Sequence, residues 1–168
     1  MTAPAARKRS PQFVLPEGRE PHTRFHIRPD GPFLYAVVRV WESRAALLRH
    51  RRASGMRGAC EAYCVGLDVY AVRPSGRTRR TGQFAEVNFY RRAITQGIVT
   101  HEMFHATLAW GRRVGIAWAA LGESMDGAGP VSDVEERLAY VHGALCSEFV
   151  RTAHELGLYD TAEGDPCR

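Results

Sequence analysis

The chain has 168 residues, of which 45% are hydrophobic and 24% are charged. This length fits one domain, and the composition excludes a chain that is disordered throughout. No apolar run reaches the roughly 20 residues of a membrane span, and no apolar stretch typical of a signal peptide follows the basic N-terminus. We therefore expect a cytoplasmic protein that makes no contact with membranes.

The formal net charge of +5 comes almost wholly from arginine, which clusters at residues 49–52, 77–80, 91–92 and 112–113. Such clusters can neutralise the phosphates of a nucleic acid. They are more often a solvated basic surface. Nucleic acid is therefore kept as a partner that the sequence permits but does not favour.

Residues 1–30 are rich in proline and lack a sustained apolar period, so they are predicted to form a flexible or extended arm. Residues 31–160 are predicted to form a single domain. A short tail over residues 161–168 is expected to follow it.

The first part of that domain is predicted to be a sheet. The β-branched and aromatic run from Phe33 to Trp41 indicates a strand, and Ser43 is a candidate N-cap for a short helix that ends near Gly55. Two more strands are expected over residues 63–72 and 83–90, the second with alternating polar and apolar residues. We expect an α+β fold with a small, mostly antiparallel sheet of about three strands.

The second part is predicted to be helical. Apolar residues recur at helical spacing from residue 93 to about residue 113, which predicts one helix. A glycine-rich linker over residues 114–131 precedes a long helix from Ser132 to about Leu156. No internal repeat interrupts this order.

The first of these helices contains the sequence His-Glu-Met-Phe-His at residues 101–105. Residues four apart lie on the same face of a helix, so His101 and His105 can bind one zinc ion together. Glu102 is offset from both histidines and is predicted to deprotonate the attacking water as a general base. This HExxH pattern indicates a catalytic zinc site.

A catalytic zinc site needs a third protein ligand. The candidates downstream are Glu123, Asp126, Asp133, Glu135, Glu136 and His142. Ser132 and Glu135 have the spacing of a capping box, which gives Glu135 a structural role. Glu136 shares its helix face with small residues, so we expect it to be the third ligand, with Glu135, His142 and the loop acids as alternatives.

The chain resembles the zincin superfamily of metallopeptidases, and within it compact gluzincin-like proteins, in which a glutamate in a Glu-x-x-Ala context follows HExxH on a second helix. That context is here Glu136-Arg137-Leu138-Ala139, and the resemblance covers roughly residues 60–157. It implies that His101, His105 and Glu136 bind Zn²⁺ and that Glu102 is the general base. It also implies a small sheet packed beside the HExxH helix.

In zincins the strand before the HExxH helix is commonly the edge along which a peptide substrate lies. Here the resemblance places that edge at about Gln83 to Tyr90, where a peptide would pair by strand addition. Tyr140, His142 and Tyr159 are the candidates for stabilising an oxyanion.

These patterns predict a zinc-dependent metallopeptidase that hydrolyses a peptide or protein substrate. The alternative is a non-catalytic zinc-containing module that binds nucleic acid or protein through its arginine clusters. An intact Glu102 favours the enzyme, because a purely structural zinc site has no use for it. The sequence leaves the oligomeric state open.

Overall fold

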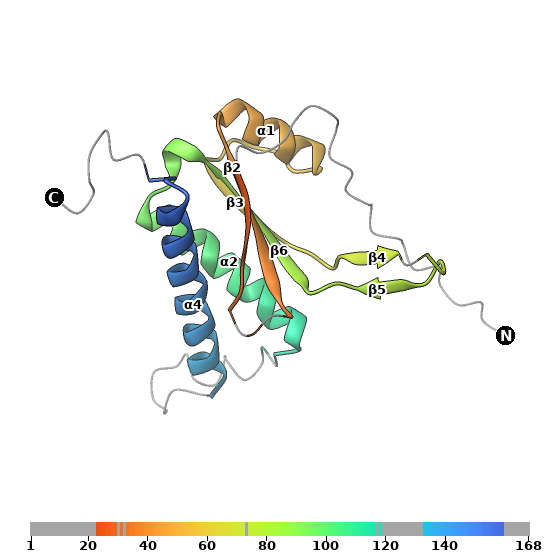
Figure 1. Ribbon diagram of the computed structural model, residues 1–168. Helices are drawn as coiled ribbons and strands as arrows, with labels where there is room; N and C mark the ends of the chain where they lie inside the picture. Colours follow the sequence, from red (N-terminus) through yellow and green to blue (C-terminus); the bar gives the residue numbers. More distant parts are fainter. Residues whose placement is uncertain are drawn as a thin grey trace.

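A computed structural model of the chain describes residues 23–29, 31, 33–72, 74–116, 118 and 133–159. These residues form a sheet with helices α2 (Gln96–Val114) and α4 (Asp133–Glu155) on one face and helix α1 (Arg44–Ala53) on the other (Figure 1). The fold is therefore α+β, as expected. Residues 1–22 and 160–168 lie outside the described part of the chain, and so does most of the predicted linker.

The sheet has four strands in the order β1 (Thr23–Ile27), β2 (Tyr35–Trp41), β6 (Gln83–Tyr90) and β3 (Ala62–Gly66). β1 and β3 each pair antiparallel with their neighbour, whereas β2 and β6 pair parallel. The sheet is thus mixed, with one strand more than expected. The additional strand, β1, lies within residues 1–30, which the prolines had indicated to be an arm.

The position of β6 corrects one expectation. The strand that leads into the HExxH helix lies between β2 and β3, so both of its edges are occupied. A peptide cannot add to it. The edge strand next to β6 is β3. Although β6 follows β3 in the sequence, it inserts between β2 and β3 and leaves β3 at the border of the sheet.

The strand predicted over residues 63–72 is divided in two. After β3, the chain continues into β4 (Tyr70–Val72), which pairs with β5 (Thr78–Arg80) as a separate two-stranded ribbon. This ribbon projects away from the sheet (Figure 1). All six of its residues are exposed, so it has no apolar core of its own.

The helices begin where the sequence offers capping side chains. The Ser43 hydroxyl accepts a hydrogen bond from the Ala46 N–H at the start of α1, and Thr95 does the same for Ile98 at the start of α2. Helix α2 therefore starts at residue 96, after a 3₁₀ turn at Arg91–Ala93, rather than at residue 93. Ser132 lies outside the described residues, so the capping box stays a prediction.

The main core lies between the sheet and the pair α2 and α4. Its largest fully buried side chains include Phe84, Phe89, Met103, Trp110 and Phe149. Burial of this apolar surface fixes α2 against β6 and β3. Among the described helices, none is both long and apolar enough to cross a membrane.

The opposite face of the sheet carries a buried polar cluster under α1, made of Arg39, Trp41, His50, Tyr63, Glu86 and Asn88. The Arg39 guanidinium lies 2.9 Å from the Glu86 carboxylate. On the other side, His50 Nδ1 shares a hydrogen bond with the Tyr63 hydroxyl, and its Nε2 lies 3.7 Å from Glu86. These contacts fit the histidine tautomer with its proton on Nε2, which leaves Nδ1 to accept from Tyr63.

Candidate metal centre

The two histidines of HExxH point their rings at a common position. His101 Nε2 and His105 Nε2 lie 3.2 Å apart, and the ring planes are inclined by 80°. Two nitrogens bound to zinc at about 2.05 Å with tetrahedral angles would lie about 3.3 Å apart. Both side chains belong to exposed residues, so a metal ion could reach them from solvent. The observed spacing therefore fits a shared zinc ion.

Glu102 differs from its histidine neighbours because it is buried. Only 6% of the residue is exposed, and no described residue donates a hydrogen bond to its Oε2. This burial raises the pKa of the Glu102 carboxyl, while the charges of His101 and Arg51 oppose the rise. A buried carboxylate with a free oxygen, beside two histidines, is typical of a functional site rather than of a structural one.

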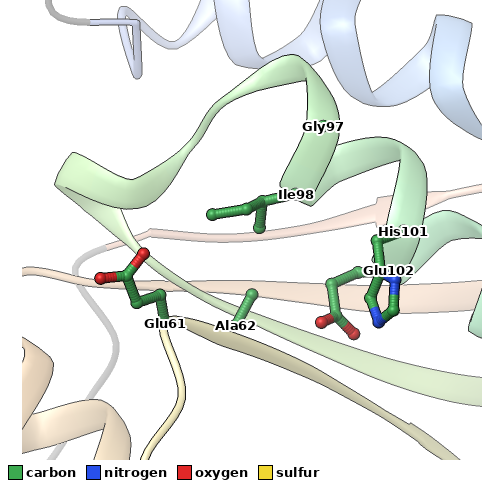
Figure 2. A pocket seen from close by; sticks show the side chains of 6 residues that line it. All are labelled: Glu61, Ala62, Gly97, Ile98, His101 and Glu102. Carbon is green, nitrogen blue, oxygen red and sulfur yellow. The ribbon is translucent and has the colours of Figure 1, made fainter.

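A depression of about 300 Å³ lies between the start of α2 and the start of β3. Figure 2 shows His101 and Glu102 at one end of it, Glu61 at the other, and Ala62 and Ile98 between them. Its volume is at the low end for ligand sites, and it opens to solvent. His101 and Glu102 therefore face a shallow site that is bounded by the start of β3.

The backbone of β3 offers free hydrogen-bonding groups beside these side chains. The bonds Tyr90 N–H to Glu61 carbonyl and Leu67 N–H to Phe84 carbonyl show that the odd-numbered residues point toward β6. In an antiparallel pair the residues between them point outward. Ala62, Cys64 and Gly66 therefore direct their N–H and C=O groups to the open edge, where no described strand pairs with them.

β3 also runs very close to the HExxH helix. A Cβ atom built on Gly66 would lie 3.2 Å from the Cβ of Ala109, one turn after His105. Since β3 and α2 run in the same direction, Ala62 lies beside Ile98 and His101, and Gly66 beside Ala109. The free edge of β3 thus runs alongside the two histidines.

The structure does not bring Glu136 together with the histidines. Arg137 lies over the Trp110 ring at 5.1 Å, and His142 contacts the Phe104 ring at 6.0 Å, so α2 and α4 run antiparallel. In this register, His142 is level with His105. Glu136 is six residues earlier, about 9 Å further along the axis at 1.5 Å per residue.

The other candidate ligands are dispersed. Glu123 and Asp126 lie outside the described residues, while Asp133 and Glu135 belong to the first turn of α4. Across the part of the chain that the structure describes, no group of three or more His, Cys, Asp or Glu side chains is positioned to hold a metal ion. His101 and His105 are brought together as predicted, and the third ligand stays a prediction.

The candidate oxyanion residues occupy different places on or beyond α4. Tyr140 is 72% exposed, and Tyr159 packs on the ring of His154 at the far end of the helix. His142 is half-buried, and its buried Nδ1 has no hydrogen-bond partner among the described residues. Of the three, His142 is the one whose ring is in contact with a residue of HExxH, Phe104.

Sequence reasoning missed the contribution of β3 to this site. Glu61 and Ala62 line the depression, but they are separated from HExxH by about forty residues and lie in no recognisable motif. The one available signal was Gly66 within an apolar strand, because glycine there often marks a close approach of another element.

Comparisons of the chain with protein-family models, curated proteins and solved structures found no match.

Proposed function

We propose that this protein is a zinc-dependent peptidase. The observation that carries the proposal is the 3.2 Å separation of His101 Nε2 and His105 Nε2, next to the buried carboxylate of Glu102. A hydrogen bond between the two rings would also give such a distance. That hydrogen bond would not explain why Glu102 Oε2 is buried without a hydrogen-bond partner among the described residues. A site that activates water would explain it.

Each side chain has a distinct role in this proposal. His101 and His105 would hold the ion, and a bound zinc would supply Lewis acidity that polarises a carbonyl and acidifies water to a pKa of about 7. Glu102 would accept the proton of the attacking water and deliver it to the leaving amine. Its raised pKa suits this exchange, because the carboxyl then holds a proton more readily than an exposed glutamate does.

The third ligand would come from α4. The resemblance to gluzincins favours Glu136, whereas the register of α4 against α2 favours His142, which is level with His105. Either residue belongs to a helix that packs directly on α2.

The substrate would be a peptide in extended form. The outward N–H and C=O groups of Ala62, Cys64 and Gly66 could pair with it as an additional strand of the sheet. Since β3 runs alongside α2, a peptide bound there would pass close to His101 and His105.

The test combines metal analysis with hydrolysis of a proteome-derived peptide library. Wild-type protein should hold one zinc per chain and cleave the library, and Glu102→Gln should keep the zinc and lose cleavage by at least about a hundredfold. Glu155→Gln, an exposed position near the end of α4, should behave as wild type. Zinc-loaded wild type without cleavage, or full cleavage by Glu102→Gln, would contradict the proposal.

A further inference from the structure

The face of α2 that carries the two histidines continues beyond them. Arg112 follows His105 by seven residues, so it lies within about 20° of His101 and 20° of His105 around the helix axis at 100° per residue. It is exposed, and it makes no ion pair with a described residue. The adjacent Arg113 is in contrast bound to Asp68 at 3.3 Å and to the Thr81 carbonyl. Unlike Arg113, Arg112 is therefore not held by an ion pair with any described residue, which leaves it able to meet a ligand.

Arg112 also lies close to β3. Burial raises the pKa of the Cys64 thiol on β3, and the Arg112 charge opposes that rise. The Gly66 contact with Ala109 places Arg112 just past the end of β3. Arg112 thus belongs to the part of α2 that lies beside the far end of β3, remote from the depression.

The open edge does not stop at Gly66. Leu67 N–H bonds to the Phe84 carbonyl of β6, and Thr81 N–H bonds to the Val69 carbonyl, which extends the β4–β5 ribbon back toward the sheet. The far end of the edge therefore leads to a ribbon with exposed Arg79 and exposed Tyr70. Its other arginine, Arg80, is paired with Asp68.

We propose that the site selects an extended peptide with an acidic side chain about four residues before the cleaved bond, and that Arg112 binds this side chain. The spacing follows from the geometry. Met103, midway between the histidines, precedes Arg112 by nine residues, about 13.5 Å along the helix. An extended peptide covers that distance in about four residues at 3.3 Å each. The acid lies on the N-terminal side if the peptide pairs antiparallel to β3, the more stable arrangement.

This inference deepens the proposed peptidase function and rests on it. Arginine suits the role because its planar, always charged guanidinium can bind a carboxylate through two hydrogen bonds. The contribution is to recognition, since Arg112 lies too far along α2 to touch the reacting atoms. It is therefore a specificity-determining residue.

The first test uses cleavage of the proteome-derived peptide library, read by mass spectrometry. Wild type should cleave preferentially where Asp or Glu is about the fourth residue on the N-terminal side of the cleaved bond. Arg112→Glu should lower that preference roughly three- to tenfold, Arg112→Lys should keep part of it, and higher salt should weaken it. The control Arg49→Glu reverses an exposed charge on α1, across the sheet, and should leave the preference unchanged.

Cleavage without acidic preference, or a preference that survives Arg112→Glu, would overturn the inference while leaving the peptidase intact. A second measurement does not need hydrolysis. Zinc-loaded Glu102→Gln protein should bind a fluorescein-labelled peptide of glutamates followed by alanines more tightly than its lysine counterpart, and adding Arg112→Glu should abolish the difference. If this protein instead binds a DNA oligonucleotide through Arg112 and neither peptide, the inference is wrong.

Discussion

Gly66 of β3 and Ala109 of α2 are in close contact, with 3.2 Å between the Ala109 Cβ and the position of a Cβ on Gly66. The contact joins the open edge of the sheet to the HExxH helix, one turn after His105. It explains how a peptide on β3 could lie near the two histidines, because any larger side chain would hold strand and helix apart.

Gly66→Val should therefore destabilise the protein by about 1–3 kcal/mol, because the added methyl groups overpack the contact with Ala109. Urea unfolding followed by circular dichroism would measure this. Gly143→Ala is the matched control. Gly143 lies exposed within α4 with nothing within 4 Å of an added Cβ, so this change should stabilise the protein by up to about 1 kcal/mol. Equal stability of Gly66→Val and wild type would show that β3 is not pressed against α2.

Zinc content should identify the third ligand. Replacing the true ligand with alanine should lower zinc affinity by at least about tenfold, because two histidines alone leave a three-ligand site incomplete. Metal analysis after dialysis against a weak chelator would compare Glu135→Ala, Glu136→Ala and His142→Ala. Loss of zinc in Glu136→Ala alone would support the glutamate, and loss in His142→Ala alone would support the histidine. Retention in all three would place the ligand outside these positions.

The buried His50 should make stability depend on pH. Burial lowers the pKa of His50, and Glu86 only partly offsets this, so the folded state takes up a proton less readily than the unfolded chain. His50 therefore stabilises the fold fully above the unfolded pKa near 6.5, and this contribution is lost as the pH falls below it. Urea unfolding from pH 7.5 to 5 should show a loss of at most about 1.4 kcal/mol per pH unit from this group.

The variants His50→Gln and Tyr63→Phe separate this effect from the loss of a hydrogen bond. His50→Gln should flatten the acid side of the stability curve, because glutamine does not titrate. Tyr63→Phe should destabilise the protein by about 1 kcal/mol at every pH, since it removes the hydroxyl but keeps the buried imidazole. If His50→Gln kept the wild-type slope below pH 6.5, His50 would not be the titrating group.

The ion pair between Arg39 and Glu86 lies at 2.9 Å, with 10% and 13% of the two side chains exposed. Glu86→Leu should destabilise the protein by about 3–5 kcal/mol, because it leaves the Arg39 charge buried without its carboxylate. Arg39→Met combined with Glu86→Leu should recover most of the loss, since no charge then remains to be buried. A double variant as unstable as the single one would show that packing, not charge, holds this cluster together.

The sequence by itself determined the features that depend on neighbouring residues. The spacing of His101 and His105 on one helix is local, and the two rings lie together as expected. The N-cap at Ser43 and the strand over residues 83–90 were also predicted from neighbouring residues, and the bounds of that strand match β6. Helical and extended periodicities act over a few residues, so they can be read directly from the chain.

Only the tertiary structure decided which strand borders the site. β6 precedes the HExxH helix in sequence, yet it lies inside the sheet, and β3 forms the edge because strand order depends on long-range pairing. The same reason applies to α4, whose register against α2 sets His142 rather than Glu136 level with His105. Spacing along the chain brought His101, Glu102 and His105 together on one helix, whereas packing between elements set β3 at the edge beside them.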